Sequence, residues 1–432
     1  MDSRRSFLKT MSSTVLLPSA LLSAAAMAAP PKPEMHSDPQ SEEASFVQWY
    51  DVDRTMTNLE NAYWGIMSRP VIEEFWRLTQ FVNRVNVPFV RGATPALALP
   101  TELLKVRTAV AELIGAQLEE IALTRCGTES LQDLISGYRG LKPGDVVIFC
   151  DLDYDAMQNT MLFLKDRRGV EVATFTIPEP ATTANILAAY EQILKNTPKA
   201  KMMLVTHLCH RTGLVMPVKE IVAMAAGHGV TVVLDTAQAV GQMPVNVNDL
   251  NVDFAGFSLH KWIGAPLGTG AIYIRKGKLE EMDLCLGNHE DDPNDIRSRV
   301  YSGTYNFAAM LTIPRAIAFH NQLTVERKQA RLRFLRNYWV NRVRDIDGLE
   351  ILTPDEVGRY GATTSFRLKN MHAFEDAKKV QDLLIGKYRI MTVARNGITQ
   401  GAAVRVTPAL YNTTADLDQL VTALHAEQNC LA

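Results

Sequence analysis

Short apolar runs that alternate with helical patterns in the middle of the chain constrain its fold more than any other feature. The runs cover residues 146–150, 201–208, 230–236, 253–259 and 270–276. Several of them lack the polar alternation of a half-exposed strand, and residues 217–229, between two of them, have the apolar period of a helix. Strands buried on both faces and joined by crossover helices are typical of parallel sheets. The pattern therefore predicts an α/β fold whose mainly parallel sheet is flanked by helices.

The length and composition of the chain predict more than one domain. With 432 residues, of which 47% are apolar, the chain can bury a large core. A basic helical pattern over residues 326–346 marks the passage into a smaller α+β domain. We therefore expect a large domain over residues 58–315 and a small carboxy-terminal domain over residues 316–432. We interpret the arginines of the basic helix as a solvated face rather than as a site for an acidic partner.

The amino-terminal residues resemble a twin-arginine export signal. Paired arginines in SRRSFLK, residues 3–9, precede a moderately apolar stretch, and Ala26-Met27-Ala28 fits a cleavage site. We therefore predict a signal peptide over residues 1–28, cleaved near Ala28, with the twin-arginine translocase as a transient partner and the periplasm as the location. This route carries folded proteins, which hints at a cofactor inserted before export. Proline-rich, polar residues follow, and we expect a flexible leader over residues 29–57.

Charge and cysteine content exclude some other classes of protein. The chain has 45 lysines and arginines against 47 aspartates and glutamates, which leaves no cationic excess for a polyanion, so we expect no nucleic-acid partner. The cysteines form no CxxC pair, and we expect them to be reduced and mostly structural. They are Cys126, Cys150, Cys209, Cys285 and Cys430.

Two charged residues follow predicted strands and carry the strongest functional signal. Asp235 ends the apolar run in LDTAQAVG, and Lys261 follows the next run in GFSLHKWIGAPLGTG. Ligands of parallel α/β sheets bind at the carboxyl ends of the strands, where both residues fall. A carboxylate there needs a cation or a hydrogen-bond donor, and a desolvated lysine becomes nucleophilic because its pKa falls. Taken singly, Asp235 could cap a helix and Lys261 could point into water.

Together with HLCH (residues 207–210) and SLH (residues 258–260), these motifs resemble the class V aminotransferases of pyridoxal-phosphate (PLP) fold type I. That family includes cysteine desulfurases and isopenicillin N epimerase, and the resemblance runs from about Asn58 to the carboxyl terminus. It implies PLP as the cofactor and a seven-stranded type of mainly parallel sheet. It implies two catalytic residues: Lys261 as the Schiff-base lysine, and Asp235 as the carboxylate that keeps the pyridine nitrogen protonated.

The resemblance also implies a set of cofactor-binding residues. Gly127 and Thr128 match a phosphate-binding turn that opens a helix, although such a pair could begin any helix. Tyr154 falls where the family stacks a ring on the cofactor, or is a core tyrosine. The remaining matches are Gln238 and His210 near the phenolic oxygen of the cofactor, Ser258 and His260 at the phosphate, and Thr304, which implies a homodimer because it reaches the phosphate of the neighbouring subunit.

Arg405, in VRVTPALYNTT, matches the family's arginine that binds the substrate α-carboxylate, a task that suits the guanidinium fork. NLENAYWGIM, residues 58–67, resembles the family's amino-terminal substrate loop. Arg395 or Arg211 could meet a distal carboxylate of the substrate, but we interpret both as surface charges.

The stretch before Arg405, residues 390–405, contains no cysteine, so the sequence disfavours a desulfurase, which needs a mobile thiolate there. Transamination, epimerisation and elimination by a lyase all begin with proton abstraction by Lys261, and the choice stays open. A chain that combines these motifs with an export signal resembles the periplasmic PLP enzymes of pyoverdine maturation. This implies a peptidyl glutamate of a siderophore precursor as the substrate.

Two other classes of protein compete with this interpretation. A metal hydrolase could use His207, Cys209 and His210 as ligands, but zinc catalysis also needs a base and a partner motif such as HExxH, which is missing, so we predict no metal. A non-catalytic binding protein could retain the fold. The joint presence of Lys261, Asp235 and Arg405 disfavours it.

Overall fold

The computed structural model describes residues 39–93, 98–301 and 303–431. The predicted signal peptide, residues 1–28, lies outside the described residues, as does the leader up to residue 38. Among the described helices, none combines the length and apolar character needed to cross a bilayer.

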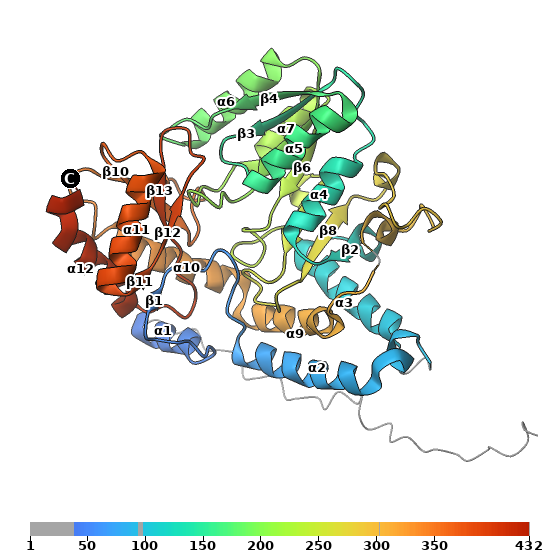
Figure 1. Cartoon of the computed structure of the whole chain (residues 1–432), viewed down its shortest axis with the longest axis horizontal. Helices are drawn as coiled ribbons and strands as arrows, with labels where there is room; N and C mark the ends of the chain where they lie inside the picture. Colours follow the sequence, from blue (N-terminus) through green and yellow to red (C-terminus); the bar gives the residue numbers. More distant parts are fainter. Residues whose placement is uncertain (1–38, 94–97, 302, 432) are drawn as a thin grey trace, which may run out of the picture. The chain divides into compact units, whose positions relative to one another are not determined.

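A seven-stranded sheet forms the centre of the larger domain (Figure 1). Its strands are, in spatial order, β2 (Ile121–Thr124), β8 (Gly270–Ile274), β7 (Phe254–Ser258), β6 (Thr231–Asp235), β5 (Ala200–Thr206), β3 (Val146–Cys150) and β4 (Glu171–Phe175). Neighbouring strands from β7 to β4 pair in parallel, whereas β8 pairs antiparallel with both β2 and β7. The predicted mainly parallel sheet is therefore confirmed.

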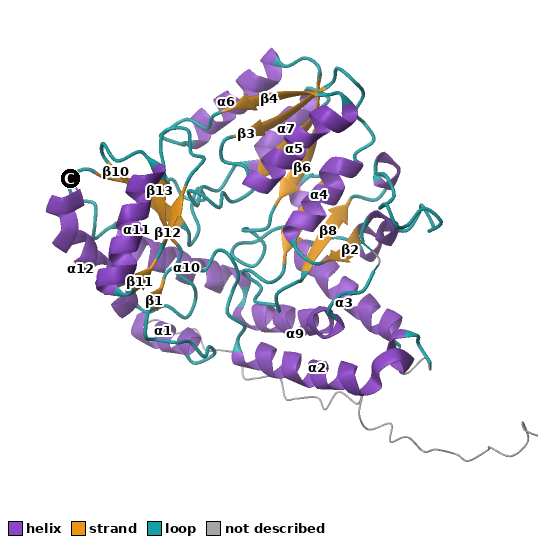
Figure 2. Cartoon of the chain, viewed as in Figure 1, coloured by secondary structure: helices purple, strands orange, loops and turns teal. Residues whose placement is uncertain are grey.

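Helices cover both faces of this sheet because its strands are apolar on both sides (Figure 2). In β3, Val147 and Phe149 pack with one set of helices, and Ile148 and Cys150 with the other. The first set is α4 (Gly127–Gly137) and α5 (Asp155–Arg168). The second is α3 (Leu99–Ile114), α6 (Thr183–Asn196), α7 (Val218–Gly227) and α9 (Phe307–Leu323), and α2 (Arg69–Val90) packs on α9. Because the strands are buried on both faces, they lack polar alternation in the sequence.

The smaller domain is an antiparallel sheet with helices. Its four strands, in spatial order, are β12 (Val393–Arg395), β13 (Ala403–Val406), β10 (Thr364–Leu368) and β9 (Leu349–Ile351). The helices are α10 (Val325–Val340), α11 (Phe374–Tyr388) and α12 (Thr414–Leu431), and a parallel pair joins β1 (Thr57–Asn58) to β11 (Ile390–Met391). The remaining short helices are α8 (Val247–Leu250), η2 (Leu118–Glu120), η3 (Leu279–Glu281) and η4 (Ile296–Arg299).

The change of core occurs later in the chain than residue 315. The predicted boundary cuts through α9, whose later residues Ile317 and Leu323 still pack in the large-domain core, as does Leu332 of α10. Leu335 and Trp339, further along α10, pack in the small-domain core. A continuous helix thus joins the two cores, and a helical pattern alone does not show which core each turn contacts.

The predicted flexible leader is wrong from residue 39 onward, because residues 39–47 form helix α1 (Pro39–Val47). Glu42 of α1 pairs with Arg327, and Glu43 pairs with Arg331, whose side chain is only 2% exposed. The solvated basic face predicted for α10 is therefore wrong at these positions. Both errors have one cause: the acidic residues and their arginine partners lie far apart in the sequence.

Candidate active site

Asp235 and Lys261 follow adjacent parallel strands. Asp235 is the last residue of β6, and Lys261 follows Ser258 at the end of β7. The two strands pair in parallel, with Asp235 opposite Gly256, so the two residues lie at the same edge of the sheet. Asp235 is 6% exposed, and its Oδ1 accepts a hydrogen bond of 2.9 Å from the Ala237 amide.

The charges of these two residues act on each other. Burial raises the pKa of Asp235, and the positive charge of Lys261 opposes that rise. Burial also lowers the pKa of Lys261, which the charge of Asp235 opposes and that of Arg405 reinforces. The structure therefore brings Lys261, Asp235 and Arg405 into one electrostatic environment, in which the lysine amine is easier to deprotonate than in water.

The predicted phosphate turn opens α4 beside the end of β7. The Gly127 amide donates to Ser258 Oγ at 3.0 Å, and a Cβ at position 127 would come within 3.0 Å of that oxygen. The Thr128 amide has no hydrogen-bond partner within the described ranges. A free amide at a helix amino terminus, with the Ser258 hydroxyl beside it, suits a phosphate group.

His260 is held in one tautomer. Its Nδ1 lies 2.9 Å from the Thr269 carbonyl oxygen, which can only accept, so Nδ1 carries the proton. Burial, followed by the charge of Lys261, lowers the pKa of His260 to about 4. The ring is therefore neutral at pH 7, and its Nε2 could donate to a phosphate oxygen only after the phosphate charge had raised that pKa.

The Gln238 amide is oriented by protein contacts. Trp262 Nε1 donates to Gln238 Oε1 at 2.8 Å, and Gln238 Nε2 donates to the Ala62 carbonyl oxygen at 2.9 Å. An indole nitrogen can only donate, so this contact fixes which end of the amide is the oxygen. One N–H of Nε2 remains to donate to a ligand, as the prediction for Gln238 requires.

The rings of Tyr154 and His210 pack edge to face near the phosphate turn. Their ring centroids lie 5.0 Å apart with an interplanar angle of 86°. Burial raises the pKa of Tyr154, and a hydrogen bond with Thr128 opposes that rise. Neither ring nitrogen of the buried His210 forms a hydrogen bond with the described residues, and Nε2 lies 3.9 Å from Asp155 Oδ2. Burial and nearby cations hold the pKa of His210 well below the usual range. Such orphaned polar atoms fit a site that accepts a polar ligand.

Arg405 is buried, and its guanidinium already has partners. It donates to the His210 carbonyl oxygen and pairs with the carboxylate of Glu60, while its Nε has no partner among the described residues. Glu60 Oε1 also lies 3.9 Å from Arg395 Nη2, and Glu60 Oε2 is buried without a hydrogen bond. Sequence reasoning missed Glu60, although it lies within the loop identified as the substrate loop.

The two other arginines differ from each other. Arg211 is 1% exposed, pairs with Asp155 and donates to the main-chain carbonyls of Asp151 and Asp153, so its interpretation as a surface charge is wrong and its role is structural. Arg395 keeps a partly exposed side chain, its Nε has no partner among the described residues, and burial with the charge of Arg405 lowers its pKa to about 10.

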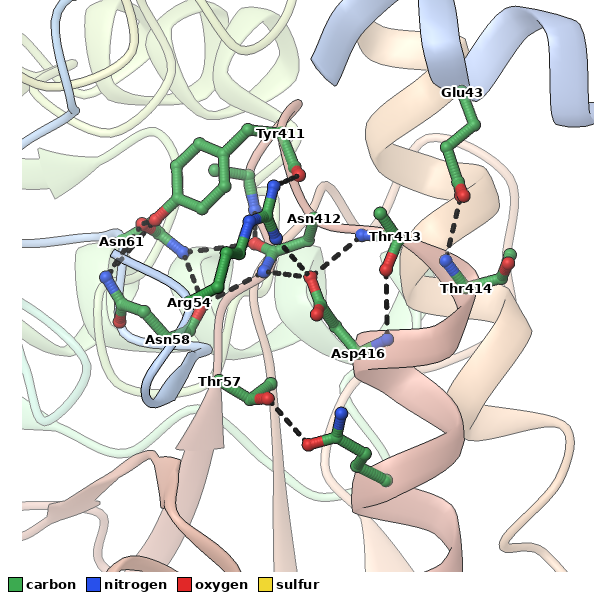
Figure 3. A network of polar contacts seen from close by, with 12 residues as sticks. Glu43, Arg54, Thr57, Asn58, Asn61, Tyr411, Asn412, Thr413, Thr414 and Asp416 are labelled. Atoms are coloured by element: carbon green, nitrogen blue, oxygen red, sulfur yellow. Dashed lines mark hydrogen bonds and ion pairs between the residues drawn. The ribbon is translucent and has the colours of Figure 1, made fainter. Parts of the chain in front are cut away.

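The loop over residues 58–67 is tied to the carboxy-terminal region by a polar network (Figure 3). Asn61 Nδ2 donates to the Thr407 carbonyl oxygen at 2.8 Å, and its Oδ1 accepts from the Tyr411 hydroxyl. Asn412 Nδ2 donates to the Asn58 carbonyl oxygen and to Asp416 Oδ2, both at 3.1 Å. The network therefore fixes the loop that carries Glu60 and the Ala62 carbonyl.

Two predictions concern residues outside this cluster of contacts. Thr304 is exposed on the loop before α9 and forms no hydrogen bond or ion pair with the described residues. In the HLCH segment, Cys209 Sγ contacts the Leu152 carbonyl oxygen, and His207 Nδ1 lies 3.3 Å from Thr236 Oγ1. The described part of the chain holds no group of three or more His, Cys, Asp or Glu side chains that could bind a metal ion.

The fold and the site define a PLP-dependent enzyme of fold type I. A family model, Aminotransferase class-V, matches residues 77–420, and the chain belongs to that family. PLP is therefore the cofactor, and the family, fold and cofactor predicted from the sequence are confirmed. When bound, PLP supplies a ring that withdraws electrons from the substrate α-carbon.

Curated relatives fall in two functional groups. The isopenicillin N epimerase of Streptomyces clavuligerus is 26% identical over 87% of this chain and 96% of the relative. The cysteine desulfurase of Haloferax volcanii is 29% identical over 75% of this chain and 78% of its own length. Among solved structures, an apo cysteine desulfurase from Thermococcus onnurineus NA1 superposes with a TM-score of 0.77 at 20% identity over 92% of this chain and 100% of that one. This last likeness shows the shared fold.

Proposed function

We propose that this enzyme acts on the α-amino group of an amino acid or peptidyl amino acid, as a transaminase or an epimerase. The observation that carries the proposal is the placement of the buried Lys261, whose pKa is lowered by burial, and of Asp235 at one edge of the sheet, where their charges act on each other. The finer proposal is that the substrate is the glutamate residue of a pyoverdine precursor, reached in the periplasm after export by the twin-arginine translocase. The amino-terminal motif SRRSFLK supports it.

The side chains divide the chemistry among them. Asp235 would hold a proton on the pyridine nitrogen of PLP. The Thr128 amide would hold its phosphate, together with His260 and with the Ser258 hydroxyl, to which the Gly127 amide donates. Lys261 would hold the cofactor through its Nζ, and the same amine would take the α-proton of the substrate. Arg405 would bind the substrate α-carboxylate and orient that proton toward Lys261.

Several observations favour this reaction class over sulfur transfer. The described cysteines lie elsewhere than residues 390–405: Cys150 and Cys209 are buried, and Cys126 accepts a hydrogen bond from the Glu129 amide at the start of α4. The relatives do not choose between the two classes, because an isopenicillin N epimerase is matched over 96% of its length and a probable cysteine desulfurase of Pyrococcus abyssi over 95%. An elimination by the same Lys261 remains the second candidate, because it shares the first proton transfer, and a non-catalytic binding protein is the third.

Product analysis tests the proposal. The purified enzyme with PLP is incubated with single amino acids and with a peptide that carries glutamate, and mass and chirality of the products are measured. A keto product supports transamination, and an unchanged mass with inverted configuration supports epimerisation. Lys261→Ala is expected to lower the rate by about 10²- to 10⁴-fold. If every candidate substrate is recovered unchanged and none alters the absorbance spectrum of the cofactor, catalysis is contradicted and a binding protein is favoured.

A further inference from the structure

Lys328 is a buried lysine that the proposed reaction does not use. It lies on α10, is 3% exposed, and donates from Nζ to the main-chain carbonyl oxygen of Trp262 at 2.9 Å. Its second contact is His320 Nδ1 of α9, at 2.8 Å. Among the described carboxylates, none lies within ion-pairing distance of Lys328 (Arg327 and Arg331 on the same helix do have such partners). A buried cation without an anion is costly, so its retention requires a reason.

The contacts of Lys328 lead directly to the catalytic lysine. Trp262 follows Lys261 in the chain, and the Lys261 carbonyl oxygen accepts from the Gly264 amide, which closes a tight turn. The Trp262 indole holds Gln238, as described above. Lys328 thus holds the main chain of the residue that joins Lys261 to Gln238.

A small cavity separates α10 from this turn. Its volume is about 40 Å³, with room for about one water molecule, and its lining includes Lys261, Trp262, Lys328, Asn61 and Tyr411. The cavity therefore lies between the turn, the helix α10 and the loop of Figure 3. Lys328 lines this cavity and bonds directly to the turn, so its side chain links α10 to the turn beside the cavity.

We propose that Lys328 is a positioning residue: by holding the Trp262 carbonyl oxygen it sets the direction of the Lys261 side chain toward the cofactor. The proposal rests on Lys261 as the cofactor lysine and is independent of the substrate. It goes beyond the proposed reaction because it assigns control of the Lys261 geometry to α10, a helix that carries no other predicted site residue.

The groups that face Lys328 are consistent with a proton-linked contact. Burial lowers the pKa of Lys328 to about 7. His320 is the acceptor, since burial and the charge of Lys328 hold its pKa well below the usual range. Tyr50 and Tyr411 line the cavity, and burial raises the pKa of both phenols, so they stay neutral. Lys261 is the other cation at the cavity.

Lys328→Met tests the proposal, because methionine keeps the length of the apolar stem and removes the donor. We expect the dissociation constant for PLP, measured by titrating the visible absorbance, to rise about tenfold, the equivalent of one lost hydrogen bond from a charged group. Lys219→Met removes an exposed lysine of α7 and is expected to leave PLP binding unchanged. His320→Leu leaves Lys328 in place without its acceptor, and a smaller rise is expected.

A second readout follows the proton. The pKa of Lys328 is lower in the folded than in the unfolded chain, where it is near 10.5, so the unfolded chain binds more protons between these values. The free energy of unfolding of the PLP-free protein should therefore rise with pH above about 7, and less so in Lys328→Met. Unchanged PLP affinity in both variants would overturn the positioning role. Failure of the wild-type protein to bind PLP would instead overturn the assignment of Lys261.

Discussion

The carboxylate of Glu60 forms an ion pair with Arg405, the arginine that was predicted to bind the substrate carboxylate. Its main chain is held by the Asn58 side chain, which accepts from the Glu60 amide at 2.9 Å, and by a parallel bridge to Thr407. The main chain of Glu60 therefore cannot move far, whereas its side chain can turn, and its Oε1 lies between Arg405 and Arg395. A substrate carboxylate would have to displace Glu60 from Arg405, and Arg395 is the cation toward which it would turn.

The variant Glu60→Gln separates competition from substrate contact. Because the amide no longer competes as an anion, we expect KM for the amino-acid substrate to fall several-fold with kcat little changed, and the free energy of unfolding to fall by about 1–3 kcal/mol because Arg405 loses its ionic partner. Steady-state kinetics and urea unfolding measure the two effects. Glu112→Gln, on an exposed position of α3, is the control. A rise in KM would mean that Glu60 binds the substrate itself.

The location of Asp235 and Lys261 was predictable from the sequence because their positions at strand ends determine where they lie. Asp235 and Lys261 each end or follow a run of apolar residues, and parallel strands bring such ends to one edge. The pairing of Glu60 with Arg405 was not predictable in the same way. It joins residues of two segments that are far apart in the chain, and neither segment has a pattern that identifies its partner.

Helix α1 contributes to stability through its acidic residues. Glu43 Oε2 accepts from Arg331 Nη2 at 2.9 Å. It also accepts from the Thr414 amide, at the start of α12, at 2.8 Å (Figure 3). One carboxylate thus links three helices. The apolar period of α10 was visible in the sequence, whereas the burial of its arginines depends on α1, whose composition is that of a leader.

Glu43→Gln should therefore destabilise the protein. The amide keeps the shape of the side chain but loses the charge that compensates Arg331, so we expect the free energy of unfolding to fall by about 1–3 kcal/mol. Thermal and denaturant unfolding measure the change, and Glu73→Gln, on an exposed position of α2, serves as the matched control. Equal stability of the two variants would show that α1 does not hold α10.

At the scale of the whole molecule, the alternation of strands and helices determined the fold class, and the seven-stranded sheet follows from it. The position of the second core was harder to predict because α10 belongs to both cores. At this scale, the family resemblance of the sequence predicts a homodimer. The exposed position of Thr304 is consistent with a contact to a neighbouring subunit.

Light scattering during gel filtration tests the dimer. We expect a mass about twice that of one chain, and we expect Thr304→Ala to weaken PLP binding about two- to tenfold, because one hydrogen bond to the phosphate is lost across the interface. A wild-type protein that is monomeric and that binds PLP no more tightly than Thr304→Ala does would show that each chain completes its own site.

The central claim is that Lys261 is the lysine that holds PLP, and borohydride reduction followed by peptide mass spectrometry tests it most directly. Reduction fixes the cofactor to the lysine that carries it, and digestion then identifies the peptide. We predict the cofactor mass on the peptide that contains Lys261, and its loss in Lys261→Ala. Recovery of that mass on another lysine, above all the buried Lys328 with its pKa near 7, would contradict the account.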